Sequence, residues 1–191
     1  MKKMSGFAVF GIILLVLALG LGAWGVGSYN SLIGMQETVT SQSANIDTYL
    51  QRRADLIPNL VNTVKGFTSH ESEILNEISN SRAKLAGAQT MADKSSANTE
   101  LSGAISRLLV VVENYPNLKA DAQFTALMDE LSGTENRLTV ARKDYNAAVQ
   151  TYNRKIKTFP ANIIAGMFGF SAADYFEASA SSSEAPAVNF N

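Results

Sequence analysis

Residues 124–159, FTALMDELSGTENRLTVARKDYNAAVQTYNRKIKTF, decide the fold, because their large apolar side chains recur at intervals of seven. That spacing lays one apolar stripe along a helix, as in the long helices of bundles and coiled coils. Gly133 costs this helix about 1 kcal/mol of propensity, which packing can offset. The stripe consists of Phe124, Leu131, Leu138, Tyr145, Tyr152 and Phe159. The stretch predicts one long helix with one buried face.

Three more helices are expected upstream, over residues 30–67, 68–86 and 99–114, with residues 87–98 as a polar connection. Their apolar residues follow the helical spacing, with little of the alternation typical of strands. Short connections between long helices favour an antiparallel four-helix bundle. The seams expected to be buried are Leu32, Val39 and Ile46; Leu50, Ile57 and Val64; Ile74, Ile78 and Leu85; and Leu101, Ile105, Leu108 and Val112. The sequence therefore predicts an all-α domain over residues 29–158.

Local signals refine the ends of these helices. Pro58 removes a backbone donor inside the first helix, so a kink or break is expected there. Thr68 and Glu71 have the T-x-x-E spacing of a capping box, which would begin the second helix. Tyr115 precedes Pro116 and should end the third helix, because the residue before a proline avoids the α region.

Residues 7–26, FAVFGIILLVLALGLGAWGV, form an uninterrupted apolar run, and no charged residue lies between Met4 and Gln36. A helix of this length rises about 30 Å, which is enough to cross the hydrocarbon core of a bilayer. Its aromatic end suits the headgroup layer. Residues placed in the span include Phe7, Ile12, Leu15, Leu19, Trp24 and Val26. We predict a membrane anchor over residues 1–28.

The charges around this run predict its orientation. Lys2 and Lys3 favour a cytoplasmic N-terminus in a bacterial inner membrane, with residues 30 onward outside the cytoplasm. A cleaved signal peptide remains an alternative, although the apolar run exceeds the roughly 7 to 15 residues usual there. A stripe of Gly20, Gly22 and Gly25 is a further alternative, as a surface for close helix pairing.

The segment 159–178 is expected to form short helices that pack on the bundle or on the membrane. Pro160 suits the first turn of one helix, and Ser171 with Asp174 would cap another. The apolar residues of the segment are Ile163, Ile164, Met167, Phe168 and Phe170. They would be core if folded onto the bundle, or else a contact patch for lipid or a partner. Residues 179–191 are predicted to be a flexible tail.

The composition excludes several classes of function. The formal net charge is −1, which disfavours nucleic acid, since phosphate binding requires clustered positive charge. There is no cysteine, and His70 is the only histidine, so thiolate and multi-histidine metal sites are excluded within one chain. The sequence also lacks a phosphate-cradling glycine motif. We therefore predict no catalytic, cofactor-binding or metal-binding residues.

Polar residues gather on the first and last predicted helices of the bundle. Arg53 continues the seam of Leu32, Val39 and Ile46, so its guanidinium should be partly buried and need a carboxylate such as Glu135. The predicted polar network consists of Arg53, Asp55, Asn59, Glu135, Arg142 and Asn146. It can be a structural salt-bridge network, a pocket for a small ligand or, as a third alternative, a catalytic site.

The chain resembles the LemA family along its length. The matching stretches include LQRRADLIPNLV at 50–61, YPNLK at 115–119, and the pairs YN at 145–146 and 152–153 and FP at 159–160. The resemblance implies a single-pass membrane protein with a four-helix, bromodomain-like mirror-variant bundle. It implies no established enzymatic activity, cofactor or catalytic residue, and only a loose link to the organisation of the envelope or of organelle membranes.

These observations predict a membrane-anchored helical scaffold of the bacterial envelope, oligomeric and without catalysis. Its expected partners are the lipid bilayer and either further copies of the chain or another membrane protein. The alternatives are a sensor of a small ligand or of stress that uses the polar network, and an enzyme of unknown type.

Overall fold

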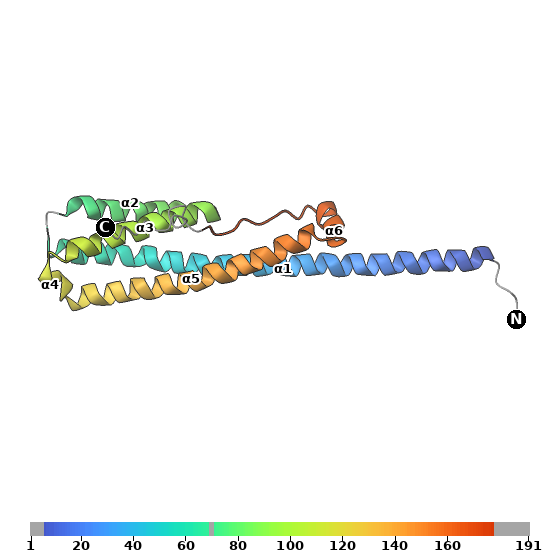
Figure 1. The fold of residues 1–191 in the computed structure, drawn as a ribbon, viewed down its shortest axis with the longest axis horizontal. Coiled ribbons are helices and arrows are strands. Elements are labelled where there is room, and N and C mark those ends of the chain that lie inside the picture. Colours follow the sequence, from blue (N-terminus) through green and yellow to red (C-terminus); the bar gives the residue numbers. More distant parts are fainter. Residues whose placement is uncertain (1–5, 69–70, 178–191) are drawn as a thin grey trace, which may run out of the picture. The chain divides into compact units, whose positions relative to one another are not determined.

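The computed structural model describes residues 6–68 and 71–177, and these residues form α-helices and no strand (Figure 1). The all-α prediction is therefore confirmed for the described residues. His70 and the predicted flexible tail lie outside them. The helices are α1 (Gly6–Lys65), α2 (Ser72–Gly87), α3 (Met91–Val112), α4 (Pro116–Lys119), α5 (Ala122–Lys157) and α6 (Ala161–Met167).

The chain divides into two compact units, and α1 and α5 each contribute to both. The smaller unit contains residues 1–40 and 148–173, and the larger unit contains residues 41–147 and 174–191. Within the larger unit, α2 packs on α3. The antiparallel four-helix arrangement as a whole stays a prediction.

The seven-residue seams are buried nearly as expected. In the larger unit Ile46 and Leu138 are fully buried, and in the smaller unit Leu32 and Tyr152 are buried. On α2, Ile74 is only partly buried and its neighbour Leu75 takes the core position. The larger exception is Phe159, with 76% of its surface exposed. The prediction that it continues the buried stripe is wrong, because α5 ends at Lys157 and Phe159 lies beyond the last helical turn.

Helix α1 runs through Pro58 without a break, so of the two expected outcomes the break is wrong and the kink stays a prediction. Proline lacks the N–H that would bond to the carbonyl four residues earlier, which leaves the oxygen of Ala54 free. The Nε of Arg82 on α2 donates a hydrogen bond to that oxygen at 2.8 Å. A side chain from the neighbouring helix thus satisfies the backbone group that the proline leaves unpaired.

Helix α2 starts later than expected, so the prediction of a capping box at Thr68 and Glu71 is wrong. The helix begins at Ser72, with Glu71 as its N-cap residue and no side-chain capping bond. Thr68 instead donates to the hydroxyl of Tyr115 at 3.2 Å, and that hydroxyl donates to Glu71 Oε1 at 2.8 Å. The two residues are joined through Tyr115, which lies between α3 and α4, and not through a cap.

Helix α3 starts earlier than expected, within the segment predicted to be a polar connection. Thr90 accepts a hydrogen bond from the backbone of Asp93, and the Asp93 carboxylate accepts one from the backbone of Thr90. This reciprocal pair is a capping box that satisfies two N–H groups at the helix start. Helix α3 does end as predicted, before Tyr115 and Pro116.

The segment after α5 contains the first of the two predicted short helices, α6. It ends at Met167 and is followed by Gly169, whose φ of 74° allows the N–H of Phe170 to donate to the oxygen of Ala165 at 2.9 Å. Residues 171–177 contain no helix. The prediction of a second helix, capped by Ser171 and Asp174, is therefore wrong. Side chains of other helices form hydrogen bonds with the backbone groups of these residues instead.

Candidate functional site

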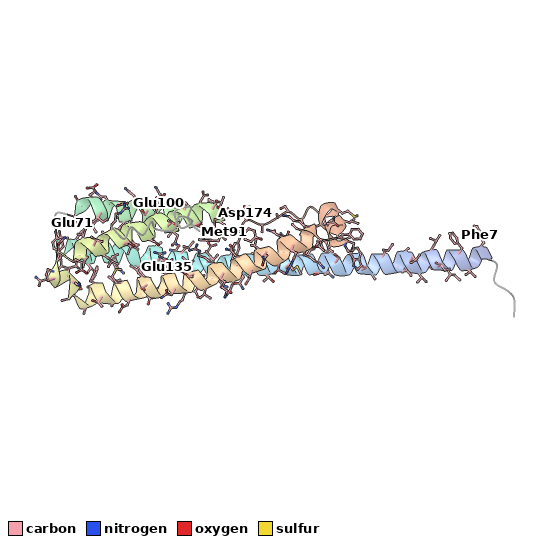
Figure 2. The ribbon with its side chains drawn as sticks, viewed as in Figure 1. Phe7, Glu71, Met91, Glu100, Glu135 and Asp174 are labelled. Atoms are coloured by element: carbon pink, nitrogen blue, oxygen red, sulfur yellow. The ribbon has the colours of Figure 1, made fainter. Side chains whose placement is uncertain are left out.

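The predicted span is a helix with apolar side chains exposed on every side. Phe7 lies at the described start of α1 (Figure 2). It is 87% exposed, and Leu21 is 68% exposed. This stretch is the one in the described part of the chain that is long and apolar enough to cross a membrane. A helix that is apolar all round needs an apolar surrounding, which a bilayer provides.

In the smaller unit, α6 packs against α1 where the apolar run ends. The Cδ1 atom of Ile164 lies 3.7 Å from the position that a Cβ at Gly25 would occupy. The ring of Tyr29 lies 4.8 Å from that of Phe168 and 5.7 Å from that of Phe170, measured between centroids. These contacts fix α6 beside the C-terminal end of the predicted span.

The other face of α6 is apolar and exposed. Ala161 and Ala165 face the protein and are buried, whereas Met167 is 72% exposed. The surface of large exposed side chains around α6, which we call the α6 patch, consists of Phe159, Ile163, Met167 and Phe168. Of the five predicted contact residues, Ile163, Met167 and Phe168 thus face outward, while Ile164 and Phe170 are partly buried against α1.

Basic residues directly precede the α6 patch. Arg154, Lys155 and Lys157 occupy the last turn of α5, where cations interact favourably with the helix dipole. Within the described residues, none of these three side chains forms a salt bridge with a carboxylate. The smaller unit therefore combines an exposed apolar helix face with uncompensated positive charge.

In the larger unit, Arg53 is a charged residue inside the core, with 3% of its surface exposed. Its Nη1 donates to Asn98 and to Glu135, and its Nη2 donates to Ser102 at 3.0 Å. Burial lowers the pKa of Arg53, and the neighbouring Glu135 carboxylate partly opposes that shift. The expected pairing of Arg53 with Glu135 is present, and we call these four residues the Arg53 cluster.

The remaining members of the predicted network do not join this cluster. Asp55 is exposed and accepts a hydrogen bond from Gln51 at 2.8 Å. Asn59 is also exposed. The six predicted residues therefore do not form one polar site.

Arg142 and Asn146 belong to a second site, which holds residues 174–177, here called the strap. The side-chain amide of Asn146 pairs twice with the backbone of Phe176. Its Nδ2 donates to the carbonyl at 3.0 Å, and its Oδ1 accepts from the N–H at 2.9 Å. The guanidinium carbon of Arg142 lies 4.6 Å from the centre of the Phe176 ring, a cation–π distance.

Two hydroxyl groups complete this strap site. Tyr145 donates to the carbonyl of Asp174 at 2.7 Å, and Ser95 on α3 donates to the carbonyl of Glu177 at 2.6 Å. Burial raises the pKa of Tyr145, and the charge of Asp174 adds to the shift. The phenol therefore stays a hydrogen-bond donor over the whole neutral range.

The smaller unit contains a second pairing of an asparagine side chain with a backbone. Asn153 is buried, donates to the carbonyl of Ala173 at 2.8 Å and accepts from its N–H at 2.9 Å. Sequence reasoning missed the strap, its contacts with Ser95 and Tyr145, and the pairing of Asn153 with Ala173. The available signal was the Tyr-Asn pair repeated after seven residues, which places both amides on one face of a helix.

The larger unit also has an open surface groove between α2 and α3, of about 1150 Å³. Its walls include Lys84 paired with Glu100, and Arg107 paired with Glu77. None of the residues predicted as site residues lines this groove. Within residues 6–68 and 71–177, no group of acidic or histidine side chains is arranged to hold a metal ion.

Comparison with known proteins places these features in a family. The chain is 29% identical to the magnetosome protein MamQ 1 of Paramagnetospirillum magneticum over 78% of its own length and 64% of the relative. It is 26% identical to the magnetosome protein MamQ of Magnetospirillum gryphiswaldense, with the same coverage, and thus spans about 64% of these relatives. A protein LemA of Metamycoplasma hominis is 26% identical over 89% of this chain and 78% of the relative. The LemA family model matches residues 42–190, and the chain belongs to the LemA family.

Proposed function

We propose that this chain is a membrane-anchored helical scaffold protein of the bacterial envelope, oligomeric and acting through contacts and not through catalysis. The apolar part of α1 crosses the bilayer, and α6 lies in the headgroup layer at the end of the span. The larger unit, with ion pairs over its surface, works in water and contacts protein partners. Relatives named as magnetosome proteins support a role in a bacterial cell.

The observation that carries the proposal is the position of α6 next to Gly25 and Tyr29. A helix fixed at the end of a membrane span is held at the depth where water meets hydrocarbon. Burying the α6 patch in that layer removes apolar surface from water, at roughly 25 cal/mol for each Å². Interfacial helices bind membranes in this way.

Charge complementarity favours lipid over protein as the occupant of this surface. Arg154, Lys155 and Lys157 would lie at the level of the phosphates, and each basic residue near an anionic surface adds about 1 kcal/mol of attraction. The combination of exposed aromatic side chains with unpaired cations is typical of membrane-surface helices.

A pair of cysteine probes tests the proposal, because the chain contains no cysteine of its own. Met167→Cys probes the α6 patch, and Val110→Cys on α3 is the matched control, since both native side chains are 72% exposed. Each variant is labelled with an environment-sensitive fluorophore in vesicles containing anionic phospholipid. We expect the Met167 label to be quenched by a lipid-borne quencher and the Val110 label by aqueous iodide. Iodide quenching of both labels alike would overturn the assignment of α6 to the bilayer surface.

A further inference from the structure

The strap is held almost entirely through its main chain. Asn146, Tyr145 and Ser95 bind backbone atoms of Phe176, Asp174 and Glu177 at 2.6–3.0 Å. Hydrogen bonds to a main chain recognise an extended conformation and not the chain to which it belongs. Main-chain bonds supply affinity in the same way where peptides add to sheet edges.

One side chain gives the strap site its selectivity. Phe176 is 2% exposed and is among the largest fully buried side chains of the described protein. The guanidinium of Arg142 lies over its ring and 3.5 Å from the carbonyl oxygen of Glu177. Asp174 and Glu177 flank the aromatic residue and are at least partly exposed. The site therefore fits an extended segment that carries an aromatic residue.

The strap can leave this site at lower cost than unfolding the unit. It contains no helix or strand, and its attachment is one buried ring plus a few hydrogen bonds. Segments with few buried contacts open locally, at free energies well below that of global unfolding. Residues 168–173, which connect it to α6, contain no helix either.

We propose that the strap site also binds residues 174–177 of a second copy of this chain, so that two copies exchange straps. A second copy carries the same Asp-Tyr-Phe-Glu sequence, so its strap can form the same hydrogen bonds in trans that the chain's own strap forms in cis. Anchoring both copies in one membrane raises their effective concentration. This inference rests on the proposed membrane anchoring and names the contact by which the scaffold would oligomerise.

Cysteine cross-linking between two full-length chains tests this exchange. The Oγ of Ser95 lies 2.6 Å from the carbonyl oxygen of Glu177, so one chain carries Ser95→Cys and the other Glu177→Cys, mixed in the same vesicles. We expect a disulfide-linked dimer well above the background given by Val110→Cys paired with Glu177→Cys. A single chain carrying both Ser95→Cys and Glu177→Cys should close an internal disulfide, which confirms that the site is folded.

The Phe176→Ala substitution distinguishes the chain that accepts the strap from the chain that donates it. Placed in the Ser95→Cys chain, it weakens the competing internal strap and should raise cross-linking severalfold. Placed in the Glu177→Cys chain, it removes the anchor of the donated strap and should reduce cross-linking to background. Cross-linking at background for the mixed chains, or equal effects of the substitution in either chain, would overturn strap exchange. The lipid quenching of the Met167 label would be unaffected, so this failure is distinguishable from failure of the membrane proposal.

Discussion

The Arg53 cluster and the strap site lie in the same unit and use polar groups in opposite ways. In the cluster, the buried charge on α1 is held by side chains of α3 and α5, so every partner is itself fixed in a helix. In the strap site, side chains hold an extended backbone that has no structure of its own. The first arrangement joins helices to one another, whereas the second resembles a peptide-binding site whose ligand is part of the same chain. This difference predicts different responses to mutation.

Removal of the buried charge should have the largest effect. Arg53→Ala leaves Glu135 and Asn98 without their partner. Breaking a fully buried pair costs about 3–5 kcal/mol, and because the Glu135 side chain is 35% exposed we expect a loss at or below the lower end of that range. Thermal or urea unfolding measures the loss. The neighbouring Arg52→Ala is the control, because that side chain is 59% exposed and pairs with Glu130 at the surface; such pairs contribute about 0–1 kcal/mol. Equal losses in the two variants would contradict the distinction.

Removal of the amide that holds the strap should have a smaller and more local effect. Asn146→Ala deletes two hydrogen bonds to Phe176, each with a net value of about 0.5–1.5 kcal/mol. Hydrogen exchange should accelerate at residues 174–177 and remain unchanged around Arg53. The exposed residue Gln150, one turn along α5, gives the control variant Gln150→Ala. Faster exchange throughout the larger unit would show that the strap is part of the core and not a separable ligand.

The strap site should also respond to alkaline pH. Because burial raises the folded-state pKa of Tyr145 above 10.0, its stabilising contribution is complete below that pH and is lost as the pH rises through the folded value. Tyr145→Phe lacks the hydroxyl, so the stability difference between wild type and variant should shrink above pH 10. Tyr152, whose pKa burial also raises, titrates in both proteins and cancels. A difference that stays constant through that range would show that Tyr145 is not coupled to folding.

Arg142→Ala should have the smallest effect, about 0.5–1 kcal/mol, because a partly exposed cation–π contact contributes little. Urea unfolding can measure it against Lys143→Ala, an exposed neighbour on α5. A loss as large as that of Asn146→Ala would mean that the strap site depends on charge and not on backbone recognition.

The same two regions show what the sequence could predict. The burial of Arg53 follows from its place on a seven-residue seam, and its need for Glu135 follows from the cost of a buried charge. The start of α3 was not predictable from periodicity, because its buried residues there are Ser95, Ala97 and Asn98. Ser95 meets the strap and Asn98 meets Arg53, which explains why these two positions are polar. The strap itself depends on partners some 30 residues away in the chain, which no local pattern reveals.

The long apolar helix was predictable because its physical cause is local: an apolar run needs an apolar solvent wherever it occurs. The packing of α6 was not predictable in the same way. Its two possible roles, core or contact patch, differ only in what packs against Ile164 and Phe168. The contacts with Gly25 and Tyr29 place α6 beside the end of the apolar run, and they join residues more than a hundred positions apart.

The most direct test of the central claim uses Trp24, the only tryptophan of the chain. Its fluorescence is measured for the full-length protein in phospholipid vesicles, with bromine atoms on the acyl chains near the headgroups or with iodide in the water. Membrane anchoring predicts strong quenching by the brominated lipid and protection from iodide. Strong quenching by iodide, with no effect of the brominated lipid, would contradict it.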